Sequence, residues 1–225
     1  MSSTFKDTVI VSCGPSIGKI NLTKLNEFCK DKNIICVKQS HSLIGHKKNI
    51  ILNNIRMEKL IEKGEDTIYS VTWKDNDDSK YLKEISDYNF GVRSGFRNIK
   101  HLILNDEDLF KKVNLNLECK NIVRGPGLVT ELAIPISLKF NSKNIYIFGW
   151  DIYSYNKGYQ HYYSKKNTEC TDVDEAHVVS QYYIDYLFEN KITKNKQINI
   201  VSDLNKIRSK SVINIHMNDF NKGDI

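Results

Sequence analysis

The chain has 225 residues, 40% of them hydrophobic, so it can bury one sizeable core and is expected to fold as a single domain over residues 1–225. A formal charge of +6 suits an anionic ligand, but the lysines are scattered and form no dense basic block, which argues against nucleic acid as a partner. The five cysteines are widely spaced and include no C-x-x-C pair, which indicates neither a disulfide framework nor a structural zinc site and favours a reducing cytoplasm.

Short apolar runs alternate with helical patterns along the chain, which predicts an α/β fold. Strands are expected at residues 8–12, 33–37, 49–52, 66–72, 101–105, 144–148 and 197–201. Helices are expected at residues 21–30, 57–63, 80–85, 107–112, 128–138 and 175–189. This alternation predicts a parallel central sheet flanked by helices in a single Rossmann-like domain.

Three segments depart from the regular pattern. Pro135 falls inside the predicted helix at 128–138 and is expected to kink it, because proline lacks the backbone N–H that a helix interior needs. Residues 154–175 are rich in tyrosine, lysine and asparagine without a helical or strand period, and a loop of that length predicts a short functional lid. The polar residues 217–225 are expected to form a disordered tail.

The first seven residues are polar, and no apolar stretch approaches the length of a membrane span. We therefore expect a cytoplasmic protein without a signal peptide. Any contact with a membrane is expected to be peripheral, at its inner face. The sequence leaves a homo-oligomer open.

A glycine turn follows the first predicted strand and consists of Cys13, Gly14, Pro15 and Ser16. A turn in this place can direct the backbone amides of a helix start toward a phosphate or a nucleoside. Taken alone the signal is weak, because the turn lacks the full G-x-G-x-x-G of dinucleotide sites and the Gly-Lys-Thr of a P-loop. An ordinary structural turn is the commoner explanation of such a motif.

A second glycine turn, formed by Gly125, Pro126 and Gly127, precedes the predicted helix at 128–138. Its glycines allow the backbone to approach a ligand closely, and the helix start favours an anion. The alternative is a simple loop with an N-cap. Two such turns in one α/β domain would converge at the carboxyl edge of the sheet, so together they indicate a ligand site better than either does alone.

A polar and aromatic cluster follows the predicted strand at 144–148, where open α/β sheets place their ligand sites. The cluster comprises Gly149, Trp150, Asp151, Tyr153, Tyr159, His161 and His177. Tyrosine hydroxyls are neutral donors that can stabilise charge on a leaving phosphate, and a histidine can accept a proton near neutral pH. Tyrosines beside a loop are more often packing residues, and a lone histidine is usually structural. His161 is a rival to His177 for the role of base.

The order and spacing of these motifs resemble those of the bacterial sialyltransferases of glycosyltransferase family 42 and of the related flagellin-glycosylation proteins. Residues 9–16 are similar to the family's first strand and Gly-Pro-Ser turn. Gly149-x-Asp151-x-Tyr153, followed by Tyr159, is similar to its Gly-x-Asp-x-Tyr motif with a second tyrosine six residues further on. His177 falls where the family carries its catalytic base.

The resemblance extends to single positions elsewhere. Asn54 looks like a family asparagine that binds the nucleotide, and Gln39 stands where a second asparagine is usual. Cys13 replaces an asparagine of the glycine turn, and Pro126 replaces a serine of the second turn that contacts the nucleotide. These two departures bear on the affinity for CMP and on which nucleobase the site accepts.

The resemblance implies a variant of the GT-A fold that transfers a sialic-acid-like sugar from a CMP-activated donor to a glycan acceptor, with inversion and without a metal or other cofactor. His177 would remove the acceptor proton, and Tyr153 and Tyr159 would donate hydrogen bonds to the departing CMP phosphate. The residues expected to bind the substrate are Cys13, Gly14, Pro15, Ser16, Gln39, Asn54, Gly125, Pro126, Gly127, Gly149, Trp150, Asp151 and His161.

Two other classes of function stay open. Pterin pyrophosphokinases of a related domain type share a Gly-Pro-Ser turn and a Gly-x-Asp strand end, and they transfer pyrophosphate from ATP with magnesium. Asp151 or Asp75 would then be a metal ligand. The third class is a non-catalytic nucleotide or glycan binder, which the substitutions at Cys13 and Pro126 make conceivable.

Overall fold

The structure is a computed structural model that describes residues 6–45, 50–54, 67–72, 87–91, 128–140, 142–151 and 173–224. It describes only the backbone of residues 51–54, 67–72, 88–91, 131, 139 and 173–179. The predicted strand at 101–105, the predicted helices at 57–63, 80–85 and 107–112, and lid residues 154–172 lie outside the described residues.

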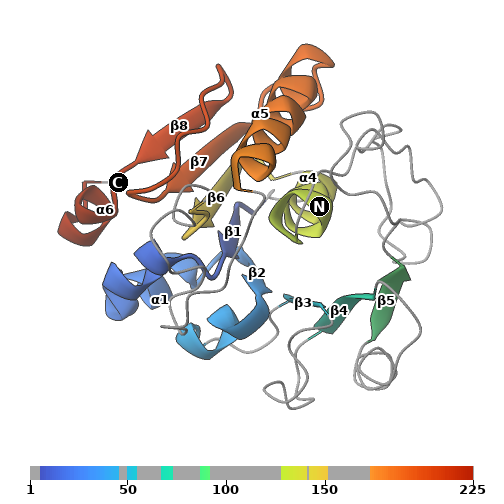
Figure 1. The fold of residues 1–225 in the computed structure, drawn as a ribbon. Coiled ribbons are helices and arrows are strands. Elements are labelled where there is room, and N and C mark those ends of the chain that lie inside the picture. The colour runs from blue at the N-terminus through green and yellow to red at the C-terminus, as the bar shows by residue number, and fades with distance from the viewer. Residues whose placement is uncertain are drawn as a thin grey trace, which may run out of the picture.

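The fold is built on an eight-stranded sheet in the order β5-β4-β3-β2-β1-β6-β7-β8 (Figure 1). All neighbouring strands run parallel. The strands are β1 (Thr8–Val11), β2 (Asn33–Val37), β3 (Ile50–Asn54), β4 (Thr67–Thr72), β5 (Tyr88–Gly91), β6 (Asn144–Phe148), β7 (Gln197–Val201) and β8 (Val212–Ile215). The predicted α/β, Rossmann-like arrangement with a parallel sheet is thereby confirmed.

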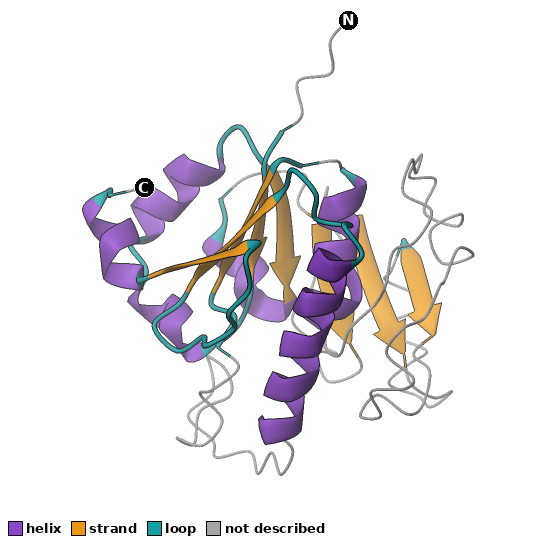
Figure 2. Ribbon diagram, turned by 90° about the horizontal axis from the view of Figure 1, so that it is seen from above, coloured by secondary structure: helices purple, strands orange, loops and turns teal. Residues whose placement is uncertain are grey.

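Helices cover both faces of the sheet. Successive side chains of a strand point to opposite faces, so neighbouring residues of β1 belong to different buried clusters. Ile10 of β1 belongs to a buried cluster with residues of α4 (Ile134–Lys139) and α5 (Val173–Glu189). Its neighbours Val9 and Val11 belong to a second cluster with residues of α1 (Leu22–Cys29) and α6 (Met217–Lys222). Figure 2 shows the two groups of helices on either side of the sheet.

The helix α1 begins at the predicted position because Asn21 caps it. Its side-chain oxygen accepts a hydrogen bond from the backbone N–H of Lys24 at 3.1 Å, which satisfies one of the unpaired donors of the first turn. Short helical turns follow the first two strands, η1 (Pro15–Lys19) after β1 and η2 (Lys38–Leu43) after β2. Among the described helices, none is both long and apolar enough to cross a membrane.

The predicted helix at 128–138 is present in a different form. A π-helical turn, η4 (Val129–Ala133), leads directly into α4, and Pro135 lies in the first turn of α4. The helix is continuous through this point, since the N–H of Ile134 donates to the carbonyl oxygen of Val129 in the π-helical turn, and Pro135 itself has no N–H to donate. The irregularity that Pro135 imposes is thus a change of helical hydrogen bonding before α4.

The end of the chain contradicts the sequence analysis. The strand at 197–201 is not the last one, because β8 pairs with β7, and residues 217–222 form the helix α6 where a disordered tail was expected. Met217 and Phe220 are buried, and the Phe220 ring centroid lies 4.8 Å from that of Phe148 in an edge-to-face contact. Two apolar residues in a polar segment give no helical period, so the contact with the core, and not the local pattern, decides this helix.

Candidate functional site

Two motifs that lie far apart in the sequence meet at the carboxyl edge of the sheet. From β1 the chain builds β2 to β5 on one side, and β6 to β8 extend the sheet on the other side of β1. The pair β1 and β6 is therefore the switch point, outside which open α/β sheets bind their ligands. The Gly-Pro-Ser turn leaves β1 here, and Gly149-Trp150-Asp151 leaves β6. Backbone bonds from Ser12 N to Phe148 O (2.8 Å) and from Gly14 N to Gly149 O (2.9 Å) join the two segments.

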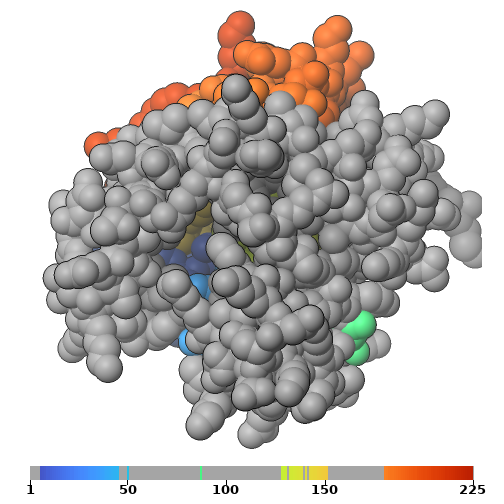
Figure 3. Space-filling view, turned by 45° about the vertical axis from the view of Figure 1, so that its right-hand side comes forward, coloured from blue at the N-terminus to red at the C-terminus, as the bar shows by residue number. Residues whose placement is uncertain are grey.

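Figure 3 shows atoms of the early chain, in blue, next to atoms of residues 128–151, in yellow. The part of the chain that carries the glycine turn and the part that carries the end of β6 are neighbours, as the backbone bonds between them require.

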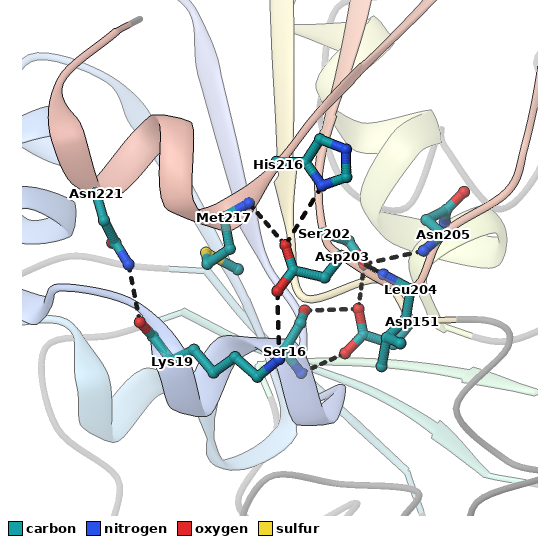
Figure 4. Close-up of polar contacts among 10 residues, drawn as sticks. All are labelled: Ser16, Lys19, Asp151, Ser202, Asp203, Leu204, Asn205, His216, Met217 and Asn221. Atoms are coloured by element: carbon teal, nitrogen blue, oxygen red, sulfur yellow. Dashed lines mark hydrogen bonds and ion pairs between the residues drawn. The ribbon is translucent and has the colours of Figure 1, made fainter.

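The side chain of Asp151 ties the two motifs together. Its Oδ2 accepts a hydrogen bond from the backbone N–H of Ser16 at 2.5 Å, and its Oδ1 accepts one from the Ser16 hydroxyl at 2.6 Å. The hydroxyl of Ser202, directly after β7, also donates to Oδ1. Figure 4 shows Asp151 between Ser16 and Ser202. The carboxylate is thus the link between the segments that follow β1, β6 and β7.

The electrostatics of Asp151 follow from this burial. Desolvation raises the pKa of the carboxyl group above its ordinary value, and the hydrogen bonds from Ser16 and Ser202 oppose that shift. The carboxylate occupies the backbone N–H that a phosphate would use at such a turn. In this structure Ser16 therefore holds Asp151, and direct contact of Ser16 with a nucleotide stays a prediction.

Gly14 permits the close approach of the two segments. A Cβ atom added at this position would lie 2.5 Å from Oδ2 of Asp151, 2.7 Å from its Cβ, and in overlap with the carbonyl oxygen of Gly149. Real Cβ atoms do not approach other atoms so closely, and the carbonyl belongs to the backbone, which cannot turn away. The glycine is required by packing, whatever the ligand.

Replacing Gly14 by alanine is expected to destabilise the protein by about 2 kcal/mol, because the new methyl group forces apart two segments that are hydrogen-bonded to each other. Gly45→Ala is the matched control, because the nearest atom of the described residues to a Cβ at Gly45 would be Oδ1 of Asn26, at 3.5 Å. Urea unfolding followed by circular dichroism checks both variants. Equal stability of the two variants would contradict the close approach described at Gly14.

Gly149 and Trp150 shape the end of β6. Gly149 has a φ of +67°, a left-handed conformation that non-glycine residues rarely adopt. Trp150 is buried, and its backbone carbonyl accepts a hydrogen bond of 2.6 Å from Nδ2 of Asn205. The turn after β6 is therefore held from two sides, by Gly14 and by Asn205.

Cys13 and Gln39 lie beside one another at the ends of β1 and β2. The Cys13 thiol is buried and donates to the carbonyl oxygen of Val37 at 2.6 Å. Burial raises the pKa of this thiol to about 11, an effect that the positive charge of Lys38 partly offsets. The side chain of Cys13 thus points toward β2. Gln39 is partly buried in η2, and Pro15 is half-buried at the start of η1.

Asn54 and His177 are placed by their backbone alone. Asn54 is the last residue of β3, so it lies at the same carboxyl edge as Gly14 and Asp151. The helix α5 leads into β7, which runs parallel to β6, so α5 begins at the carboxyl edge and ends at the opposite one. His177 lies in the second turn of α5, near this beginning. The topology therefore brings both residues to the predicted edge.

The remaining predicted site residues lie outside the described residues. They are Tyr153, Tyr159, His161, Gly125, Pro126 and Gly127, together with Asp75 of the alternative metal site. Their roles stay predictions. Within the described ranges, no group of three or more His, Cys, Asp or Glu residues is placed so that it could hold a metal ion.

The sequence analysis missed Ser202 and Asn205. Both are buried and follow β7 directly, and both bond to the segment after β6. A signal for them existed, because polar residues that follow a buried parallel strand lie at the carboxyl edge, just as Ser12 and Cys13 do after β1.

The comparisons with family models and with curated proteins identified no relative of this chain. A scan of the chain against models of protein families found no match, and a search of curated proteins found none either. The class that the fold defines is therefore stated from the structure alone: an α/β protein with a parallel, Rossmann-like sheet and a polar site at its switch point.

Proposed function

We propose that this chain is an inverting, metal-independent glycosyltransferase that moves sialic acid, or a related nonulosonic acid, from a CMP-sugar donor to a glycan hydroxyl. The observation that carries the proposal is the bond between Ser16 and Asp151, residues 135 positions apart. These residues belong to the two motifs on which the resemblance to glycosyltransferase family 42 rests. Their contact at the switch point is what a common ligand site requires.

The proposed reaction is a displacement at the anomeric carbon of the sugar. His177 removes the proton of the acceptor hydroxyl while that oxygen attacks the anomeric carbon. The bond between this carbon and the CMP phosphate oxygen breaks on the opposite side, and CMP leaves with the bonding electrons. Tyr153 and Tyr159 donate hydrogen bonds to the phosphate as its charge increases, which is the task that a metal performs in other transferases.

Lys38 is a positive charge at the described edge that suits an anionic donor, and the same edge also carries the carboxylates of Asp151 and Asp203. Lys38 follows β2 directly, and its ammonium group is close enough to Cys13 to lower the pKa of that buried thiol. Its φ is +56°, and residues other than glycine hold this conformation mainly where the surrounding structure enforces it, often at functional sites. Lys38 therefore places a positive charge near the glycine turn.

Asp151 has a structural role under either function. Both of its oxygens accept hydrogen bonds from buried serine residues, and a carboxylate oxygen can accept such a bond and still bind a metal ion. Dependence of the activity on magnesium therefore separates the transferase from the pyrophosphokinase.

The test is the release of CMP from CMP-sialic acid by the purified protein, measured by anion-exchange chromatography with and without EDTA. The proposal predicts release that EDTA does not reduce, and faster release when a glycan acceptor is added. Consumption of ATP that requires magnesium, without release of CMP, would favour the pyrophosphokinase. Binding of CMP without any release would favour a non-catalytic binder.

A further inference from the structure

The segment that follows β7 holds the end of β6 through two buried polar side chains. Asn205 donates from Nδ2 to the carbonyl oxygen of Trp150 at 2.6 Å, and its Oδ1 accepts the backbone N–H of Ile207 at 2.8 Å. Only 6% of Asn205 is exposed. A buried amide whose donor and acceptor are both used has one orientation available, because turning it over would bring donor against donor and acceptor against acceptor.

Ser202 connects the backbone of Asn205 to Asp151. The Ser202 hydroxyl oxygen accepts the backbone N–H groups of Leu204 (3.0 Å) and Asn205 (3.1 Å), and its proton is donated to Oδ1 of Asp151. The hydrogen bonds thus run from the segment after β7 to both Trp150 and Asp151. Figure 4 shows Asn205, Ser202 and Asp151 along this route.

Trp150 and Asp151 follow β6 at the switch point and belong to the residues expected to bind the donor. Whatever fixes this segment therefore fixes groups that would meet the donor. A displacement of about 1 Å at such a site can lower the rate about a hundredfold.

We propose that Asn205 is a positioning residue that fixes the Trp150–Asp151 segment relative to the donor. The part that concerns Trp150 stands on the structure described here, and the part that concerns the donor rests on the proposed function. Asn205 itself does not touch the substrate in this proposal. Its effect is on the rate of the chemical step.

The first readout requires no turnover. The chain contains two tryptophans, so Trp73→Phe leaves Trp150 as the one fluorescent indole. In this background Asn205→Asp replaces the donor to Trp150 by an oxygen while the acceptor for Ile207 is kept. Acrylamide quenching of Trp150 is expected to rise about twofold or more, because the freed segment exposes an indole that is 8% exposed in the intact protein.

Asn214→Asp is the matched control. Asn214 also donates from Nδ2 to a backbone carbonyl, that of Ile207 at 2.9 Å, but it has no bond to the end of β6. Its replacement is expected to leave the quenching of Trp150 unchanged. If Asn205→Asp does not fold, the quenching of Trp150 is measured in Asn205→Ala instead. Alanine removes the donor without placing a carboxylate oxygen against the carbonyl oxygen of Trp150.

The second readout is the kinetics of CMP release. Asn205→Asp is expected to lower kcat about tenfold to a hundredfold while KM for the donor changes less than about twofold, because the loss affects positioning in the transition state. Asn214→Asp is expected to keep the kcat of the unaltered protein. Failure of the unaltered protein to release CMP would refute the proposed function, and the quenching comparison would still decide the role at Trp150. Unchanged quenching overturns the positioning role, and unchanged kcat in a variant with raised quenching overturns its link to the donor.

Discussion

The substitution His177→Ala is expected to lower the rate of sugar transfer about a thousandfold, because it removes the proposed general base. The affinity for CMP is expected to stay within about twofold, since the base acts on the acceptor and not on the nucleotide. Steady-state release of CMP and isothermal titration with CMP measure the two quantities separately.

His216→Ala is the control for the loss of a histidine. The His216 side chain is 75% exposed, and its ring nitrogen Nδ1 lies 3.7 Å from Oδ1 of Asp203, so it has no part in the proposed chemistry. Its replacement is expected to leave the rate unchanged. Undiminished transfer by His177→Ala would refute the role of His177 as the base and would direct attention to His161.

Asp151→Ala is expected to lower the free energy of unfolding by about 4 kcal/mol, because it removes a buried acceptor of charge-assisted bonds and leaves their donors without a partner. The affected donors are the N–H and hydroxyl of Ser16 and the hydroxyl of Ser202. Chemical unfolding followed by fluorescence and by circular dichroism gives the change, and agreement between the two probes checks two-state behaviour.

Asp203→Ala is the matched control in the same segment of the chain. Asp203 accepts the backbone N–H of Met217 at 3.0 Å and so caps α6, and its ion pair with Lys19 is largely exposed. Loss of such a cap is expected to reduce stability by about 1 kcal/mol. A loss at Asp151 no greater than that at Asp203 would contradict the account of Asp151 as the link between three strand ends.

Local patterns were sufficient for the interior of the fold. After a polar first residue, β1, β2 and β6 are apolar or aromatic throughout, as a sheet covered on both faces favours, and β7 has one further polar residue, Asn199. Asn21 marks the start of α1. The patterns were insufficient at the edges of the sheet. β5 and β8 are four residues long, and α6 depends on the contacts of Met217 and Phe220 with the core. Such elements are decided by partners distant in the sequence.

The candidate site was predictable in its location but not in its internal bonds. Gly14 and Asp151 were both expected at the carboxyl edge, because each follows a buried strand. That the Asp151 carboxylate would occupy the N–H of Ser16 was not predictable, because no local pattern identifies a partner 135 residues away. Ser202 and Asn205 follow a predicted strand, so their place at this edge was predictable, whereas their partners in the segment after β6 were not.

Thermal unfolding of the purified protein with CMP, in the absence of metal, tests the central claim most directly. A ligand that binds only the folded state stabilises it, and a hundredfold excess over Kd is expected to raise the Tm by about 5 °C or more for a chain of this size. The account predicts this rise with CMP, unchanged by magnesium. No rise with CMP, or a rise only with ATP and magnesium, would contradict it.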